Sequence, residues 1–512
     1  MALIRSAATV GGYTMLSRVL GFLRDILIAA AVGAGPVADA FFVAFRIPNM
    51  FRRLVAEGAF SAAFVPLFSR RLEADGQRAA QSFAEATLAV LLGALLVLTL
   101  LAEITMPWLM RAIAPGFADD AAKFDLAVLF TRITFPYLLF MGLAALFGGV
   151  LNALYRFAAA AAAPMLLNMV LITAVLAFAQ AGPTPGHALA WGVALAGAGQ
   201  FVWMAVACHR ARLTLRLPRP RLTPDVRRLL KLMIPAGLTA GVYQVNLLVG
   251  TIVATLEDGA VSYLYYADRV SQLPLGVVGV ALGTALLPML SRSLRAGDAA
   301  RAMDHQNRAI EVSLLLTLPA AVALMVIAEP IIAVLFERGA FGAEAVAATG
   351  AGLAAFALGL PAYVLVKVLI PGFFAREDMA SPLKTSTAAM VANIALIAAL
   401  FPALGFIGIA LATAASSTLH AGLLWWWLAR RGLLVMDAQL RRRLPRMIFA
   451  SAVMAAALWL VARGLEPQLA GSLPSRIAAL AALVIGGMAV FGLCAQAFGA
   501  ARLGELREML RR

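Results

Sequence analysis

The chain has 512 residues, of which 62% are hydrophobic and only 13% are charged, and its mean hydropathy is +0.90. A soluble protein carries charge on about a quarter of its residues, so this composition excludes a soluble globular fold and predicts a polytopic membrane protein. The formal net charge of +16 then raises the question of which loops hold the excess basic residues.

Fourteen apolar segments follow one another along the chain, separated by polar stretches or by proline and glycine. Each has at least about 17 residues, the lower end of the length range of membrane-crossing helices. Several contain proline, glycine or charge, as helices that line a transport cavity often do. The predicted limits are 7–33, 37–67, 82–110, 124–153, 158–180, 187–209, 229–256, 260–290, 309–336, 345–374, 382–402, 405–429, 447–463 and 477–500.

The loops between these segments alternate in charge. Basic loops such as "SRRLEADGQR" and "HRARLTLRLPRPRLTPDVRRLLK" alternate with neutral or acidic ones such as "GAGP", "APGFADD" and "LEDGA". By the positive-inside rule the basic side is cytoplasmic, and an even number of spans places both termini there. The basic loops contain almost no aromatic residues, so we expect them to set topology and contact lipid, and we expect no nucleic-acid partner.

Three local matches recur at nearly the same offset. "FSAAFVPLFSR" (60–70) resembles "LGTALLPMLSR" (282–292), "AFR" (44–46) parallels "ADR" (267–269), and "NMVLITAVLAF" (168–178) resembles "NIALIAALF" (393–401). The offset predicts a parallel repeat of two six-helix lobes, at 1–221 and 222–432, followed by two extra helices and a cytoplasmic tail at 433–512. Such lobes can rock between inward and outward openings, as transporters do.

Charged residues inside the apolar segments are the most expensive feature of the sequence. Each basic residue at the membrane centre costs about 2.5–3.5 kcal/mol on insertion scales. Five of the eight lie in the first two segments, and acidic residues accompany them there and in the eighth. The basic residues are Arg18, Arg24, Arg46, Arg52, Arg53, Arg132, Arg269 and Lys367, and the acidic ones are Asp25, Asp39, Glu57 and Asp268.

The spacing of these charges suggests how the free-energy cost of placing them in the membrane is reduced. Arg18 and Asp25 are two helical turns apart on one face, and Asp39, Arg46 and Arg53 repeat at the same interval. Positive charge outnumbers negative charge in both segments, so a cationic surface should remain.

Further along the second segment, Glu57 follows Arg53 at a salt-bridge spacing, and Arg52 shares a face with Asn49. We expect Pro48 to break the helix there and to free backbone groups near the site.

The functional interpretation is a water-filled cationic cavity for an anionic substrate, in which arginine forks grip phosphate oxygens. The alternative is that the charges pair with one another and only hold the two lobes together.

Neither a metal site nor a cofactor is expected. Cys208 and Cys494 are far apart in sequence, and the four histidines are scattered without a metal-binding signature. No P-loop motif is present, so the membrane potential or a coupling ion is the expected driving force.

Three blocks of the sequence carry a resemblance to a known family. At "SRVLGFLRD" (17–25), "DAFFVAFRIPNMFRRLVAEGAFSAAFVP" (39–66) and "YYADRVSQLPLGVVGVALGTALLP" (265–288) the chain resembles the MurJ (MviN) family of bacterial lipid II flippases. That family belongs to the multidrug/oligosaccharidyl-lipid/polysaccharide exporter superfamily. The resemblance runs over essentially the whole chain, including "KFDLAVLFTRITFPYLL" and "VKVLIPGFFAREDMASPLK".

The resemblance implies a transporter, not an enzyme, in the bacterial inner membrane. It implies lipid II as substrate, an undecaprenyl pyrophosphate carrying a disaccharide-pentapeptide, flipped to the periplasmic leaflet by alternating access. The cell-wall synthesis machinery is a candidate partner, and the last two helices resemble a pair thought to hold the lipid tail. The implied substrate-binding residues are Arg18, Arg24, Asp25, Asp39, Asn49, Arg52, Arg53, Glu57 and Arg269.

Rival interpretations differ in the cavity they require. A drug exporter for cations should carry carboxylates and aromatics, whereas this cavity is predicted to be rich in arginine. A flippase for another polyprenyl-diphosphate glycan is harder to exclude, because its substrate also carries a diphosphate. A membrane enzyme such as a glycan polymerase would ordinarily need a large periplasmic catalytic loop, and the predicted periplasmic loops are short.

Overall fold

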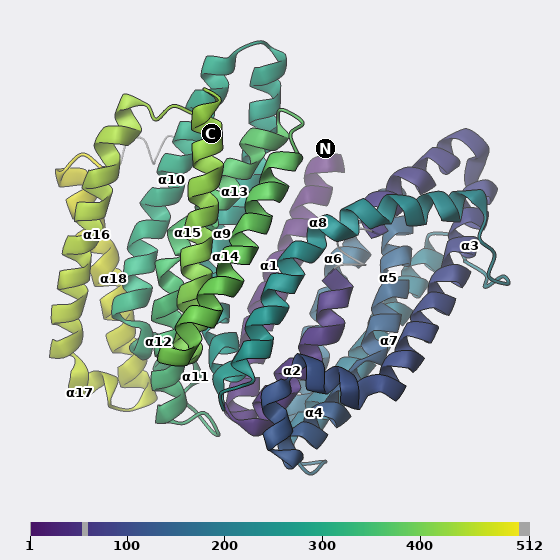
Figure 1. Ribbon diagram of the computed structural model, residues 1–512, viewed down its shortest axis with the longest axis horizontal. Coiled ribbons are helices and arrows are strands. Elements are labelled where there is room, and N and C mark those ends of the chain that lie inside the picture. The colour runs from purple at the N-terminus through teal and green to yellow at the C-terminus, as the bar shows by residue number, and fades with distance from the viewer. Residues whose placement is uncertain (1, 54–59, 501–512) are drawn as a thin grey trace. The chain divides into compact units, whose positions relative to one another are not determined.

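The computed structural model describes residues 2–53 and 60–500, and every regular element in those ranges is helical (Figure 1). The fourteen predicted segments lie largely in helix, except that residues 54–59 of the second segment are not described. Ten helical stretches within those ranges are long and apolar enough to cross a membrane. The prediction of an all-α polytopic membrane protein is confirmed, whereas fourteen crossing helices remain a prediction.

The first of two compact units comprises Met1–Ser262 and Arg338–Phe341. Within it α6 packs against α1 and α7, α5 packs against α3 and α7, and α2 packs against α4. Its helices are α1 (Ala2–Val32), α2 (Pro36–Arg52), α3 (Phe60–Ile113), the 3-10 helix η2 (Pro115–Asp119), α4 (Ala121–Thr134), α5 (Pro136–Ala153), α6 (Ala158–Phe178), α7 (Pro185–Arg210) and α8 (Pro224–Ala254).

The second unit comprises Tyr263–Glu337 and Gly342–Arg512. Here α15 packs against α12, α13 and α14, and α16 packs against α10 and α18. The predicted repeat boundaries at 221/222 and 432/433 are not tested by this division and stay a prediction. The helices are α9 (Ala260–Arg295, whose first turn belongs to the first unit), α10 (Ala299–Val326), α11 (Ala328–Phe336), α12 (Ala343–Leu358), α13 (Leu360–Phe374), α14 (Ala380–Leu404), α15 (Phe406–Arg430), α16 (Ala438–Gly464), α17 (Glu466–Leu469) and α18 (Leu473–Ala497).

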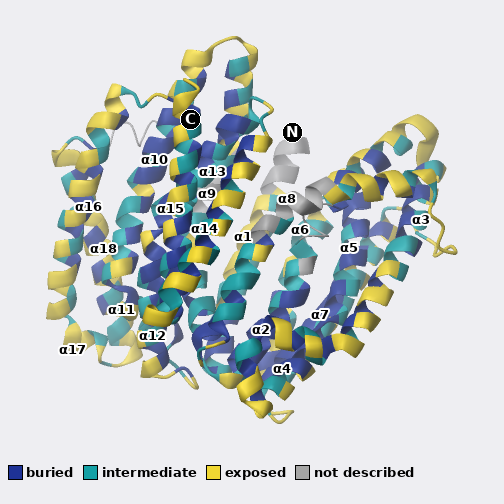
Figure 2. Cartoon of the chain, in the orientation of Figure 1, coloured by how far each residue is buried: buried dark blue, intermediate teal, exposed yellow. Residues whose placement is uncertain are grey.

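The outer surface of both units is strongly apolar. Figure 2 shows exposed residues along the flanks of α3 in one unit and of α18 in the other. On α3 they include Leu100, Ile104 and Trp108, and on α18 Ile485 and Leu493. Large apolar side chains exposed in this number would be costly in water, so these flanks are suited to contact with lipid.

Prolines divide three of the predicted segments into helix pairs. The breaks fall at Phe135 between α4 and α5, at Ile327 between α10 and α11, and at Gly359 between α12 and α13. Each break lies one to three residues before a proline, which lacks the amide hydrogen and crowds the preceding turn.

Pro48 does not break its helix, contrary to the sequence-based expectation. Helix α2 continues through it to Arg52. Pro48 has no N–H to donate to the carbonyl of Ala44. The hydroxyl of Thr134 in α4 donates to that oxygen instead, at 3.2 Å, and shares its hydrogen with the Thr131 carbonyl at 3.3 Å. Since Ala44 and Thr134 are both fully buried, a side chain from a neighbouring helix satisfies the group that proline leaves open.

We therefore expect Thr134→Val to destabilise the protein by about 1–3 kcal/mol, because it leaves the buried Ala44 carbonyl without a donor. Thr131→Val is the matched control. Thr131 is equally buried in the same helix, but its hydroxyl donates to the carbonyl of Ala127, which the α4 backbone already serves. Thermal unfolding of the detergent-solubilised protein compares the two, and equal melting temperatures would contradict the assignment.

Candidate functional site

The first candidate group is centred on Arg24, in the C-terminal third of α1. Its guanidinium donates from Nε and Nη2 to Oδ1 of Asp25 at 3.0 and 2.7 Å, and from Nη1 to Oδ1 of Asn168 in α6 at 3.0 Å. Arg24 is 5% exposed and Asp25 is 1% exposed. At this degree of burial charges are tolerated only when paired and hydrogen-bonded, and both conditions are met.

Asn168 is a member of this group that the sequence did not single out. Its amide nitrogen donates to the backbone carbonyl of Ser17 at 2.9 Å, so one side chain of α6 contacts α1 at two points, two turns apart. The only signal available was its place at the start of the repeat match "NMVLITAVLAF". An isolated asparagine in an apolar helix is consistent with such a hydrogen-bonding role between helices.

Arg18 lies apart from this group. The seven-residue spacing predicted that it faces Asp25, but Arg18 is exposed, and none of the described residues pairs with it. Asp25 instead pairs with Arg24, its neighbour in sequence. The expectation of an Arg18–Asp25 pair is wrong: the two residues share a face of α1, but Asp25 lies where that face is buried and Arg18 where it is exposed.

The second candidate group surrounds Asp39, in the first turn of α2. Its Oδ1 accepts from the backbone N–H and the hydroxyl of Ser262, at 3.0 and 2.6 Å. Its Oδ2 accepts from the N–H of Gly259 and the ammonium of Lys123, both at 2.9 Å. Asp39 thus supplies from α2 the N-terminal cap of α9, where a carboxylate is favoured by the helix dipole.

Lys123 joins Asp39 to a second carboxylate. Its Nζ also lies 2.8 Å from Oδ1 of Asp258 and 4.4 Å from the ring centre of Phe117. The side chain of Lys123 is only 1% exposed, whereas that of Asp258 is 93% exposed. The sequence placed Lys123 one residue before the predicted start of the fourth segment, so it was not counted among the charges inside the membrane segments.

The end of α2 carries the remaining predicted residues of the first unit. Nε of Arg52 donates to Oδ1 of Asn49 at 3.0 Å, which confirms that the two share a helix face. Arg53 is half-buried where α2 ends, and Glu57 lies outside the described residues. One turn earlier, Arg46 donates to the hydroxyl of Thr251 in α8.

Arg269 lies in α9, in the second unit. Its guanidinium stacks over the ring of Tyr265 at 5.0 Å, and its Nη2 donates to the Tyr265 hydroxyl at 3.0 Å. The neighbouring Asp268 accepts from Gln272 one turn further on. The aromatic platform orients a half-buried arginine and leaves its positive charge in place.

These side chains can bind anions by charge and by paired N–H donors. Among the described residues no three histidine, cysteine or acidic side chains gather as a metal site would require. Seven of the nine predicted residues therefore fall into four groups: the buried Arg24–Asp25 pair, the aspartate that caps α9, the polar end of α2 and the stacked arginine of α9. Arg18 lies apart from them, and Glu57 lies outside the described residues. The contact of all nine with substrate stays a prediction.

Comparison with known proteins identifies what the chain resembles. Residues 28–478 match the family described as lipid II flippase MurJ. The chain is 48% identical over 519 aligned residues to the probable lipid II flippase MurJ of Rhizobium meliloti, covering 100% of this chain and 97% of that protein.

Two solved structures share the fold. A lipid II flippase MurJ in an inward closed conformation superposes with a TM-score of 0.81 at 24% identity, covering 96% of this chain and 98% of the other. An inward-facing multidrug resistance transporter of the MATE family, in the MOP superfamily, superposes with a TM-score of 0.66 at 15% identity. That match covers 83% of this chain and 98% of the transporter.

Proposed function

This chain belongs to the lipid II flippase MurJ family, and we propose that it moves lipid II from the cytoplasmic to the periplasmic leaflet of the bacterial inner membrane. The observation that carries this proposal is the 48% identity to a probable lipid II flippase over the whole chain. The buried and oriented Arg24 supports it, because an arginine kept within an apolar helix has a substantial insertion penalty.

The diphosphate of lipid II is the group that the arginines would bind. A pyrophosphate on a sugar-peptide headgroup is too polar to cross about 30 Å of hydrocarbon unaided. Guanidinium forks can replace its hydration with paired N–H···O contacts. We assign this role to Arg18, Arg24, Arg52, Arg53 and Arg269, with Asn49, Asp25, Asp39 and Glu57 positioning or balancing them.

The finer architecture forms part of the same proposal. We propose fourteen membrane-crossing helices, arranged as two six-helix lobes in a parallel repeat with both termini in the cytoplasm. The last two crossing helices, α16 and α18, would hold the prenyl tail. Exposed apolar side chains along α18, among them Met488, support this assignment.

Transport would proceed by alternating access, in which the headgroup enters from the cytoplasm and leaves on the periplasmic side. The membrane potential can contribute, since one charge crossing it changes the free energy by about 2.3 kcal/mol per 100 mV. The cell-wall synthesis machinery, which uses lipid II on the periplasmic side, is the partner we expect.

Complementation tests the proposal. Bacteria depleted of their own lipid II flippase would express the wild-type chain, Arg24→Ala or Arg269→Ala at matched membrane levels. Arg295→Ala is the control, because Arg295 lies exposed at the far end of the same helix as Arg269. We expect growth with the wild type and the control, and lysis with the other two variants.

The outcomes separate the parts of the proposal. Growth with all four proteins would make Arg24 and Arg269 dispensable and would overturn their binding of the diphosphate. Lysis with a well-expressed wild type would overturn the lipid II assignment itself. A flippase for another polyprenyl-diphosphate glycan would then be the next hypothesis to test.

A further inference from the structure

A polar pocket with a volume of ≈ 610 Å³ lies in the first unit, away from both candidate groups. One wall comes from the part of α3 that follows a kink at Gly76, and the other from residues 212–216, which follow α7. The lining residues are Arg78, Gln81, Ser82, Glu85, Arg212, Thr214 and Arg216.

Hydrogen bonds between side chains of α3 and the backbone of residues 212–216 hold the two walls together. The amide of Gln81 donates to the carbonyl of Thr214 at 2.8 Å, and that of Gln77 donates to the carbonyl of Arg212 at 3.3 Å. The N–H of Arg216 donates to Oε1 of Glu85 at 2.9 Å. Alternate residues of an extended segment, 212, 214 and 216, are thus anchored along one helix face, so the pocket is present before any ligand binds.

Two backbone features give the walls their direction. Gly76 has φ +81°, which bends α3 at a position where a side chain would be strained. Arg212 has φ +60°, in the left-handed region that non-glycine residues rarely adopt, and it turns the chain out of α7. Such a conformation persists where the surroundings determine it, and it often marks a functional segment.

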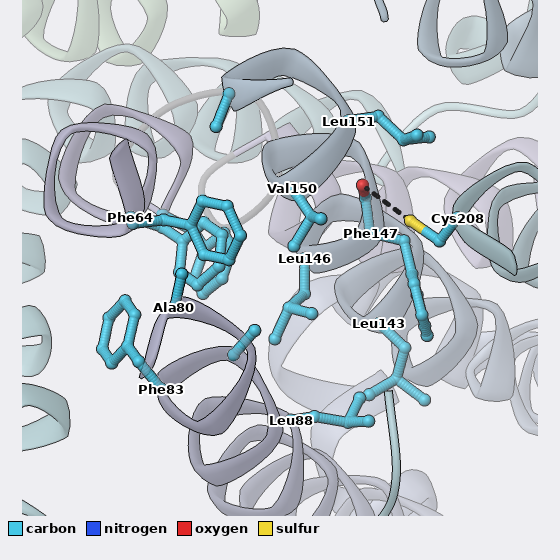
Figure 3. Close-up of a cluster of buried hydrophobic side chains, with 14 of the residues drawn as sticks. Phe64, Ala80, Phe83, Leu88, Leu143, Leu146, Phe147, Val150, Leu151 and Cys208 are labelled. Atoms are coloured by element: carbon cyan, nitrogen blue, oxygen red, sulfur yellow. Dashed lines mark hydrogen bonds between the residues drawn. The ribbon is translucent and has the colours of Figure 1, made fainter. Parts of the chain in front are cut away.

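A hydrophobic cluster forms a rigid support for the same two walls. Figure 3 shows Ala80 and Phe83 of α3, Phe147 of α5 and Cys208 of α7 in this cluster, with the Cys208 thiol directed at the Phe147 carbonyl, 3.5 Å away. Leu213, between two pocket residues, is fully buried in the cluster. Its neighbours Arg212 and Thr214 are exposed, and so is Arg216.

The charge of the pocket is unbalanced. Three guanidinium groups, those of Arg78, Arg212 and Arg216, line it together with a single carboxylate, and within the described ranges none of the three forms an ion pair. The one carboxylate, Glu85, is occupied by the Gln81 amide and a backbone N–H. The pocket also adjoins the N-terminal turns of the helix that restarts after Gly76, where the dipole favours anions.

Two arginines of the second unit, Arg308 in α10 and Arg443 in α16, differ from those of the pocket because acidic side chains neutralise them. In the second unit Arg308 pairs with Glu311 and Asp437, and Arg443 pairs with Glu311 at 2.5 Å. Both belong to loops or helix ends that, like the pocket, lie on the predicted cytoplasmic side. Basic residues on that side can therefore form ion pairs within the protein. Three guanidinium groups without an ion pair around one pocket indicate a site for an anionic ligand.

We propose that this pocket binds the phosphate of an anionic lipid headgroup at the cytoplasmic surface of the membrane. Phosphate oxygens match the N–H forks of arginine. The source we infer is a lipid, because the apolar side chain of Leu217, directly after the lining segment, is exposed. Trp203 and Val206, in the C-terminal part of α7, are exposed as well. Such residues can lie among acyl chains and headgroups while the arginines reach the phosphate.

The test measures lipid binding to the full-length protein in a neutral detergent by native mass spectrometry. The probes are dioctanoyl phosphatidylglycerol, its zwitterionic phosphatidylcholine counterpart and inorganic phosphate. We expect phosphatidylglycerol to bind most tightly, and Arg212→Gln/Arg216→Gln to weaken it by about tenfold or more. Arg227→Gln/Arg228→Gln, at exposed positions of α8 outside the pocket, should leave its affinity unchanged.

A second variant changes the affinity in the opposite direction. Glu85→Gln keeps an acceptor for the Arg216 N–H but removes the only negative charge, so phosphatidylglycerol should bind about two- to fivefold more tightly. The pocket would be overturned as the site if the Arg212/Arg216 and Arg227/Arg228 double variants lost phosphatidylglycerol binding equally. It would also be overturned if Glu85→Gln left that binding unchanged. Inorganic phosphate binding as tightly as phosphatidylglycerol would overturn the lipid as its source.

Discussion

Asp39→Ala is expected to lower the free energy of unfolding by about 3–5 kcal/mol and to abolish complementation of a flippase-depleted strain. The substitution leaves the ammonium of Lys123, only 1% exposed, without its buried carboxylate. It also removes the acceptor for the Gly259 and Ser262 N–H groups at the start of α9. A buried charge and an uncapped helix end are therefore created together.

Asp258→Ala is the matched control for this prediction. It removes the other carboxylate bound to the same ammonium, but its side chain is 93% exposed. Exposed ion pairs contribute about 0–1 kcal/mol, so this variant should melt close to the wild type. Similar melting temperatures for Asp39→Ala and Asp258→Ala would show that burial does not govern the cluster, contrary to the structure.

A double substitution separates the charge from the cap. In Asp39→Ala/Lys123→Met the buried cation is gone, and the melting temperature should recover in part. If Asp39 acts only through stability, growth should recover along with it. Continued lysis with a stable double variant would instead show that Asp39 or Lys123 is needed for transport itself.

Arg24→Lys is expected to reduce lipid II transport by about 10–100-fold although it keeps the positive charge. Arg24 contacts Asp25 through two nitrogens and Asn168 through a third, a geometry that needs a planar guanidinium. An ammonium on a flexible chain cannot hold both partners in the same directions. Transport would be followed as the lipid II left accessible on the cytoplasmic leaflet of depleted cells.

Asn168→Leu tests how Arg24 is positioned. It removes the acceptor for Arg24 Nη1 and the donor to the Ser17 carbonyl, while the Arg24–Asp25 pair can persist. We expect a partial loss of transport, smaller than that of Arg24→Lys. Full transport by Asn168→Leu would exclude the asparagine as a positioning residue.

Stability measurements distinguish binding from packing at Arg24. Arg24→Ala removes the ion-pair partner of the buried Asp25, and so should lower the melting temperature. Arg24→Ala/Asp25→Asn removes that penalty. Recovery of stability without recovery of transport would support a role in binding substrate, whereas recovery of both would make the pair a purely structural one.

The sequence alone was sufficient for the all-α membrane class, the approximate positions of most helices and the family, although the starts of α3, α10 and α16 lie nine residues or more before the predicted ones. Hydropathy over about twenty residues is a local property, and the bilayer leaves few structures other than a helix for such a segment. The prolines that divide segments 124–153, 309–336 and 345–374 into helix pairs are also visible in the sequence. The concentration of arginines in the first two segments was visible for the same reason.

Only the tertiary structure decided which partner each charge has. Helical spacing suggested Arg18 for Asp25 and could not find Asn168, which is 144 positions from Arg24. It also missed Lys123, which joins carboxylates from α2 and from the turn before α9, and Thr134, which lets α2 continue through Pro48. A buried polar group must be satisfied by whatever lies beside it. Its neighbours depend on how helices that are distant in sequence pack together. A local sequence pattern carries no information about that packing.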